Sequence, residues 1–126
     1  MKDGKFVILC VDDDPDILDS LSTILEANDY VVKTAPTAEE GLKVYREVKP
    51  DLLIVDLMME EIDAGTNFVA ELKALNNKSP VYLLSSVGAD LSRTYDTSQL
   101  GLAGVFQKPI DHKVLLSILK TKLKRV

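Results

Sequence analysis

Short apolar runs alternate along the chain with longer segments in which apolar residues recur at helical spacing. Such runs, without a polar break, are typical of strands that are covered on both faces. The runs lie at Phe6–Val11, Tyr30–Thr34, Leu52–Val55, Val81–Leu84 and Val105–Phe106. The second run is more polar than the others, which predicts a strand at an edge of the sheet.

The segments between these runs carry signals for helices. Asp14 and Pro15 provide an N-cap side chain followed by proline at the first helical position. Thr37 and Glu40 have capping-box spacing, and Asp111 is placed to cap the last helix. Apolar spacing marks helices from Ile17 to Leu25, Ala38 to Val48, Phe68 to Leu75 and Val114 to Leu123, with a loop from Met58 to Thr66. A further helix is predicted within residues 86–102, where the pattern is weakest.

This order of strand and helix, repeated five times, predicts an α/β fold. We expect a doubly wound, five-stranded parallel sheet with the flavodoxin-like strand order 2-1-3-4-5 and helices on both faces. The length of 126 residues suits a single domain over residues 1–126.

Composition narrows the class of protein. The net charge of −5 disfavours a nucleic-acid surface, and the basic segment Lys120–Arg125 is interpreted as cations that favour a helix C-terminus. No apolar run is long enough for membrane insertion and no signal segment is recognisable, so we expect a cytoplasmic location. The single cysteine, Cys10, excludes an internal disulfide and is predicted to be buried.

Polar residues follow several of the predicted strands. The carboxyl ends of parallel strands meet at one edge of the sheet, where ligands bind in such folds. Asp12 and Asp13 follow the first strand, Asp56 the third, Ser85 the fourth and Lys108 the fifth. Each residue alone could be an ordinary turn residue, but together they predict a ligand-binding site at this edge.

The three carboxylates predict a cation. Asp12, Asp13 and Asp56 would repel one another on neighbouring strands, and an all-oxygen donor set suits Mg²⁺. Zinc is disfavoured because the chain has one cysteine and one histidine, far apart. That histidine, His112, is predicted to lie on the surface without a catalytic role.

Asp12–Asp13, Asp56, Ser85 and Lys108–Pro109 together resemble the signature of response regulator receiver domains. The resemblance covers nearly the whole chain. It implies that Asp56 is the phosphoacceptor and that Lys108 pairs with a phosphoryl oxygen. The Ser85 hydroxyl would move to the phosphoryl group as a switch.

The same resemblance implies the metal ligands and the partners. Asp13 would bind Mg²⁺ directly, Asp12 through water, and Met58 through its backbone carbonyl, together with Asp56. The phosphoryl donor would be a phosphohistidine on a sensor histidine kinase or phosphotransfer protein. The protein would catalyse only its own phosphorylation and dephosphorylation. It would control a partner protein through the face formed by the fourth helix, fifth strand and fifth helix.

The chain departs from the family pattern at several positions. Val105 stands where many members carry an aromatic switch residue, and Glu60 and Ala64 replace a usual proline and glycine. Met58 and Val87, each two residues after a site residue, are apolar. Because neither side chain can orient a water molecule, we expect slow self-dephosphorylation.

Two other classes of protein remain as alternatives. One is a receiver-like scaffold that binds partners and is never phosphorylated. The other is an α/β enzyme or nucleotide binder such as a flavodoxin-type FMN protein. Against the second, aspartates rather than a glycine-rich loop follow the first strand, and Met58 stands where aspartyl-phosphate hydrolases usually carry a second Asp.

Overall fold

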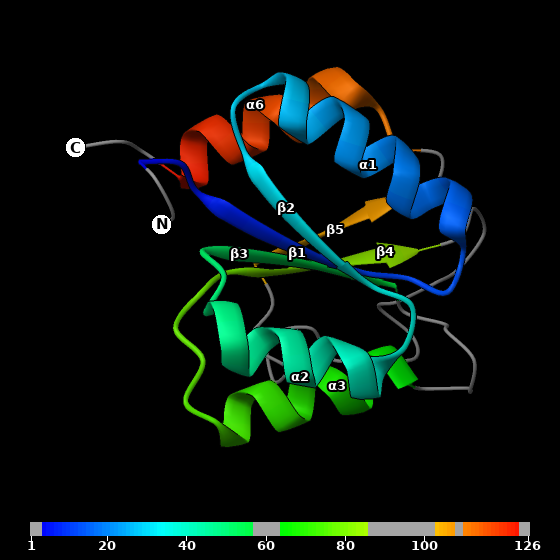
Figure 1. The fold of residues 1–126 in the computed structure, drawn as a ribbon, viewed down its shortest axis with the longest axis vertical. Coiled ribbons are helices and arrows are strands. Elements are labelled where there is room, and N and C mark those ends of the chain that lie inside the picture. The colour runs from blue at the N-terminus through cyan, green and yellow to red at the C-terminus, as the bar shows by residue number, and fades with distance from the viewer. Residues whose placement is uncertain (1–3, 57–63, 86–102, 108–109, 124–126) are drawn as a thin grey trace.

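The computed structural model describes residues 4–56, 64–85, 103–107 and 110–123, which form one α/β unit around a parallel sheet (Figure 1). The strand order is β2-β1-β3-β4-β5, and every neighbouring pair is parallel. The predicted fold class and strand order are therefore confirmed, with β2 at an edge. The elements are β1 (Val7–Val11), α1 (Pro15–Ala27), β2 (Val31–Ala35), α2 (Ala38–Val48), β3 (Leu52–Asp56), α3 (Ala64–Ala74), β4 (Val81–Ser85), β5 (Gly104–Gln107) and α6 (His112–Lys122).

Helices cover both faces of the sheet, with α1 and α6 on one face and α2 and α3 on the other (Figure 1). Because strand side chains alternate in direction, each strand contributes to both layers. Leu9 and Val11 of β1 pack in the core with α2 and α3, whereas Ile8 and Cys10 pack with α1 and α6. Burial on both faces explains why the central strands read as unbroken apolar runs.

The first helix begins as its sequence predicts. The Asp14 carboxylate accepts a hydrogen bond from the Asp16 N–H at 2.9 Å, and Pro15 occupies the first helical position. The helix ends at Ala27, and its C-cap residue, Asn28, directs a side-chain N–H to the Ile24 carbonyl at 2.8 Å. The cap fixes where the β1–α1 connection turns, and so fixes the position of the residues just before it.

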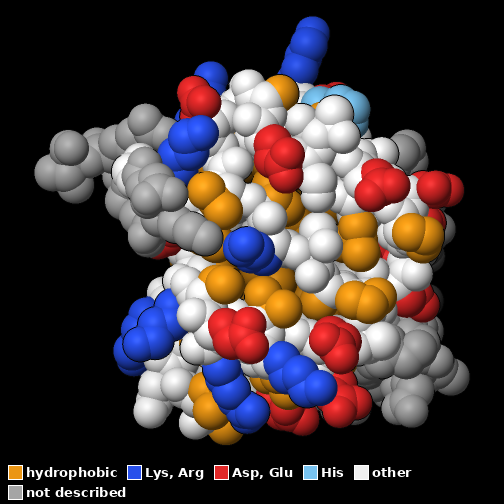
Figure 2. All heavy atoms as spheres, viewed as in Figure 1, with side chains coloured by type: hydrophobic (Ala, Val, Ile, Leu, Met, Phe, Trp, Pro, Cys, Tyr) orange, Lys and Arg blue, Asp and Glu red, His pale blue; other side chains and the backbone are white. Residues whose placement is uncertain are grey.

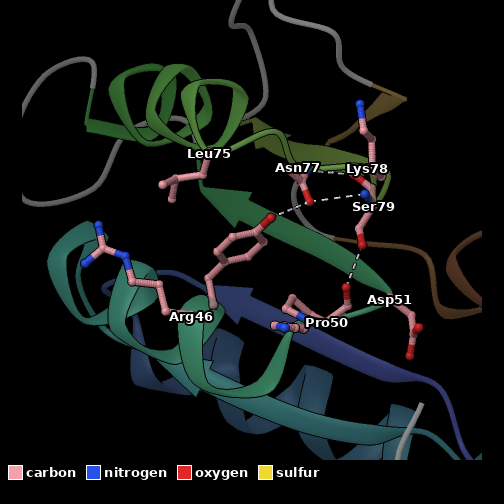
Figure 3. A pocket seen from close by; sticks show the side chains of 9 residues that line it. Arg46, Pro50, Asp51, Leu75, Asn77, Lys78 and Ser79 are labelled. Atoms are coloured by element: carbon pink, nitrogen blue, oxygen red, sulfur yellow. Dashed lines mark hydrogen bonds between the residues drawn. The ribbon is translucent and has the colours of Figure 1, made fainter.

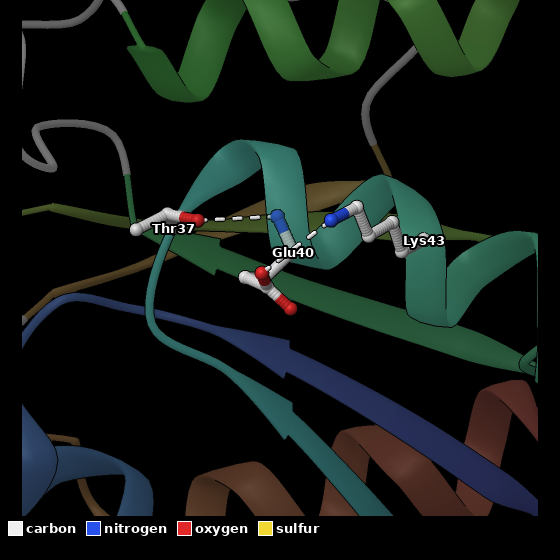
Figure 4. A network of polar contacts seen from close by, with 3 residues as sticks. All are labelled: Thr37, Glu40 and Lys43. Atoms are coloured by element: carbon white, nitrogen blue, oxygen red, sulfur yellow. Dashed lines mark hydrogen bonds and ion pairs between the residues drawn. The ribbon is translucent and has the colours of Figure 1, made fainter.

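The second helix is capped by Thr37, whose hydroxyl oxygen accepts the Glu40 N–H at 3.1 Å (Figure 4). The Glu40 carboxylate lies 3.7 Å from the Lys43 ammonium, an exposed pair worth little on its own. The helix ends where Lys49 adopts a left-handed conformation with φ 47°. Pro50 and Asp51 then lead into β3.

Helix α2 lies unusually close to the sheet at Gly41. A Cβ atom there would lie 2.9 Å from Val11 Cγ2 and 3.0 Å from Phe68 Cε2. Glycine therefore allows α2 to contact β1 and α3 at the same point.

Two details of the sequence analysis were wrong. The loop predicted over Met58–Thr66 ends earlier, because α3 begins at Ala64. The first turn of α3 has no apolar periodicity to reveal it, since the periodic positions start at Phe68. Leu75, predicted on this helix, lies just beyond its end and is 42% exposed. The helix predicted within residues 86–102 lies outside the described residues.

The last helix is capped by Asp111, which accepts hydrogen bonds from the N–H groups of Lys113 and Val114 at 2.8 and 3.3 Å. Leu115 and Leu119 bury against the sheet, whereas Val114 is 48% exposed and does not join the core. His112 is exposed, as predicted. Acidic and basic side chains are interspersed over the face drawn in Figure 2.

Candidate functional site

Three carboxylates gather at the carboxyl ends of β1 and β3. Asp12 and Asp13 follow β1 directly, and Asp56 is the last residue of β3. One ligand atom from each of the three side chains lies within 4.8 Å of the others. The convergence predicted for Asp12, Asp13 and Asp56 is therefore present in the fold.

The sheet register brings these carboxylates together. β1 and β3 are parallel neighbours in which Val11 is the partner of Val55, so the residues that follow them emerge side by side. The N–H of Asp12 donates to the Ala35 carbonyl at 3.1 Å, which continues the pairing with β2 past the end of β1. The backbone of Asp12 is thus held against β2.

Asp12 is oriented by the turn that it begins. One of its carboxylate oxygens, Oδ1, accepts the Asp14 N–H at 2.9 Å. Asp14 itself serves as the cap of α1 and so leaves Asp12 and Asp13 for the cluster. Of the three consecutive aspartates, Asp12 and Asp13 therefore belong to the cluster, whereas Asp14 caps α1.

The cluster places negative charge in a largely buried setting. Asp12 is fully buried, Asp56 is 4% exposed, and Asp13 is exposed. Ionised carboxylates are costly to bury unless they are hydrogen-bonded or paired with a cation. Oxygen atoms this close can share one hard divalent cation, directly or through water, and Asp13 leaves the site open to solvent. The donor set therefore fits Mg²⁺.

The carboxylate cluster affects the pKa of a thiol in the adjacent core. Burial, and secondarily the charge of Asp12, raise the pKa of the Cys10 thiol from 9.0 to about 12. Cys10 is fully buried in the layer under α1 and α6. It is therefore a protonated core residue, as the sequence analysis predicted, and not a nucleophile.

Ser85 lies in the next strand along the sheet. In the β3–β4 pairing Asp56 is opposite Leu84, so Ser85 follows one residue further toward the carboxyl edge. Ser85 pairs with Gln107 of β5, and Lys108 is the next residue in the chain. The Ser85 side chain, Lys108 and Met58 lie outside the described residues, so their roles stay predictions.

One residue that supports this arrangement, Asp51, was not predicted from the sequence. Asp51, before β3, accepts the Val7 N–H through Oδ2 at 2.8 Å and donates its own N–H to the Val7 carbonyl at 2.8 Å. This pair of bonds sets the start of β3 against β1, and so the register that unites Asp12 and Asp56. The sequence offered one signal for this role, because Asp51 stands between Pro50 and the apolar run of β3.

The fold and the site define a doubly wound α/β domain with a cluster of carboxylates at the carboxyl ends of β1 and β3. The family model described as the response regulator receiver domain matches residues 8–120. The chain belongs to this family of signalling domains from two-component systems. No helix in the described part of the chain is long and apolar enough to cross a membrane.

Curated relatives are transcriptional regulators that are longer than this chain. Transcriptional regulatory protein GlrR of Escherichia coli K12 is 34% identical over 118 residues, which are 94% of this chain and 26% of GlrR. The CpxR homolog of Haemophilus influenzae is 31% identical over 118 residues, which are 94% of this chain and 50% of that protein. The chain thus spans a quarter to a half of the length of these two relatives.

Two solved structures share the fold over nearly their whole length. A CheY-like receiver domain protein from Methanospirillum hungatei superposes with a TM-score of 0.85 at 30% identity, covering 94% of each chain. Chemotaxis protein CheY4 of Vibrio cholerae gives a TM-score of 0.84 at 25% identity, covering 94% of this chain and 99% of CheY4.

Proposed function

We propose that this chain is a single receiver domain over residues 1–126 whose signalling is controlled by phosphorylation of Asp56. The observation that carries the proposal is the meeting of Asp12, Asp13 and Asp56 within 4.8 Å at the carboxyl edge of the sheet. Asp56 is the member at the end of the central strand, where the sheet positions it rigidly. The phosphoryl donor is a phosphohistidine on a sensor histidine kinase or phosphotransfer protein.

The reaction is a transfer between two nucleophiles. A carboxylate oxygen of Asp56 forms a bond to phosphorus while the bond from phosphorus to the donor's imidazole nitrogen breaks. The electron pair of that bond stays on the imidazole nitrogen. The imidazole then takes up a proton from solvent and becomes a neutral histidine side chain. The product is an aspartyl phosphate, a known kind of covalent intermediate.

Asp13 would hold Mg²⁺ directly and Asp12 would hold it through water, with the Met58 carbonyl and Asp56 as further ligands. When bound, Mg²⁺ supplies positive charge that offsets the charge of the phosphoryl oxygens. Asp12 is well suited to a fixed, indirect role because the Asp14 N–H already orients its carboxylate.

Lys108 and Ser85 complete the site in this proposal. Lys108 pairs with one phosphoryl oxygen, and the Ser85 hydroxyl moves to another after transfer. A new doubly charged group that recruits a lysine and a hydroxyl can bias a two-state element. The output is a change in the face formed by the segment 86–102, β5 and α6, which controls a downstream protein. We propose neither direct nucleic-acid binding, nor membrane insertion, nor turnover catalysis for this domain.

The proposal is tested with acetyl phosphate as a small phosphoryl donor. Incubation with Mg²⁺ should add the mass of one phosphoryl group to the intact protein, and Asp56→Asn should add none. Asp14→Asn is a matched control, because asparagine caps a helix as well as aspartate does and Asp14 lies outside the cluster. An unmodified wild-type protein would favour the alternative of a scaffold that is never phosphorylated.

A further inference from the structure

A pocket lies at the amino ends of β3 and β4, at the opposite end of these strands from the acidic cluster. It is bounded by the end of α2, the start of β3, the end of α3 and the start of β4, with a volume of about 430 Å³ (Figure 3). This volume falls within the range of pockets that bind small ligands. The proposed phosphorylation site makes no use of it.

One wall of the pocket is a chain of hydrogen bonds that joins three segments. The Tyr45 hydroxyl donates to Asn77 Oδ1 at 3.0 Å, and the same oxygen accepts the Ser79 N–H at 3.1 Å. The Ser79 hydroxyl donates to the Pro50 carbonyl at 2.6 Å, and the dashed lines in Figure 3 follow this chain from Asn77 to Pro50. Because these hydrogen bonds already order the wall, the binding of a ligand costs little further conformational entropy.

The pocket is lined by basic residues on a chain that is acidic overall. Arg46, Lys49 and Lys78 line it and are exposed, and none of the three is ion-paired with a described residue. In Figure 3, Arg46 and Lys78 are seen on opposite sides of Asn77. The carboxylate of Asp51 also lines the pocket, but it accepts the Val7 N–H. These three cations therefore form a local basic region on a protein whose net charge is −5.

The ends of helices explain only part of this charge. Arg46 lies in the last turn of α2, where a cation is favourable. Lys49 is the C-cap residue of α2, so the end of this helix also accounts for its charge, whereas Lys78 lies outside the helices. Leu75 adds an apolar side chain that is 42% exposed. The pocket thus offers cations and an apolar contact at one place.

We propose that this pocket binds a short acidic peptide segment of a partner protein, with an apolar side chain against Leu75 and carboxylates paired with Arg46, Lys49 and Lys78. A peptide fits better than a nucleic acid, because the net charge of −5 opposes a long polyanion and Leu75 has no use in phosphate binding. The pocket and the acidic cluster lie at opposite ends of the strands. Peptide binding therefore does not require Asp56.

The test uses fluorescence anisotropy with a labelled octapeptide, in which a leucine–phenylalanine pair is flanked on each side by three glutamates. The wild-type protein should bind it at low salt, and Arg46→Glu with Lys78→Glu should weaken binding by about tenfold or more. Lys113→Glu with Lys120→Glu is the matched control, because it makes the same change in net charge on α6, which covers the other face of the sheet. Asp56→Asn should bind like the wild type.

Several results would overturn the proposal. They are no binding by the wild type, an equal loss in the two double variants, and equal binding of a peptide with serines in place of the leucine and phenylalanine. Tighter binding of a single-stranded oligonucleotide of equal charge would assign the pocket to nucleic acid instead. Loss of peptide binding in Asp56→Asn would show that the peptide binds near Asp56 and not in this pocket. Peptide binding and phosphorylation are measured separately, so either proposal can fail without the other. Melting curves of each variant establish that it is folded.

Discussion

Asp12 and Asp56 meet because they follow register partners: Val11 of β1 lies opposite Val55 of β3 in a parallel pair. The two carboxylates come from positions 44 residues apart in sequence, and only this register brings them into one cluster. A slip of one residue would turn the Asp56 side chain to the other face of the sheet. The hydrogen bonds between Asp51 and Val7 at the far end of the same strands oppose such a slip.

Mg²⁺ is expected to stabilise the folded protein through the acidic cluster. A ligand at ten times its dissociation constant adds about 1.4 kcal/mol to the free energy of unfolding, which thermal melts detect. Asp13→Asn should remove most of this gain and, without metal, should melt no lower than the wild type because it relieves repulsion between carboxylates. Asp14→Asn should respond to Mg²⁺ like the wild type. Equal responses of wild type and Asp13→Asn would exclude Asp13 as a ligand.

The phosphorylated protein is expected to lose its phosphoryl group slowly. Met58 and Val87 are apolar and offer no group to orient an attacking water. Met58→Asn should shorten the lifetime several-fold, and intact-mass measurements over time after removal of the donor follow the loss. A lifetime of seconds in the wild type, or no change in the variant, would show that these positions do not govern hydrolysis.

Gly41→Ala is expected to destabilise the fold. The added methyl group would lie 2.9 Å from Val11 Cγ2 and 3.0 Å from Phe68 Cε2. Overpacking typically costs about 1–3 kcal/mol, which outweighs the roughly 1 kcal/mol that alanine gains over glycine in a helix. Urea denaturation measures the difference. Ser20→Ala, at an exposed position of α1, is the control and should be neutral or slightly stabilising. A Gly41→Ala protein more stable than the wild type would refute the close contact.

The Cys10 thiol is expected to make the protein less stable at alkaline pH. In the unfolded chain it loses its proton near pH 9.0, whereas burial and the charge of Asp12 raise its pKa in the folded protein to about 12. The unfolded state therefore gains from deprotonation first, and the free energy of unfolding falls by about 1.4 kcal/mol between pH 8 and pH 10.

Urea titrations of wild type and Cys10→Ala at these two pH values isolate that contribution. The alanine variant should lack this part of the decline, although it starts from a lower stability because of the cavity. Native Cys10 should also resist thiol reagents that label it at once in denaturant. Rapid labelling of the native protein would contradict the burial.

The sequence predicted the strands and the helix caps because both depend on local signals. Unbroken apolar runs mark strands covered on both faces, and Asp14, Thr37 and Asp111 cap helices through bonds to nearby N–H groups. The meeting of Asp12, Asp13 and Asp56 followed from the strand order, since parallel strands end at one edge.

Other features depend on contacts between distant residues, which periodicity does not reveal. Gly41 sits in an ordinary helical segment, and only the fold shows that Val11 and Phe68 leave no room for a side chain. Asn77 follows α3 without any pattern that marks it, yet it links Tyr45 to Ser79. The start of α3 at Ala64 was missed because its first turn carries no apolar stripe.

The most direct test of the central claim is to locate the phosphoryl group. Protein treated with acetyl phosphate and Mg²⁺ is reduced with borohydride, which converts an aspartyl phosphate to homoserine, and the peptides are sequenced by mass spectrometry. The account predicts homoserine at position 56 alone, and none when EDTA replaces Mg²⁺. Homoserine at another aspartate, or none at all with the acidic cluster intact, would contradict it.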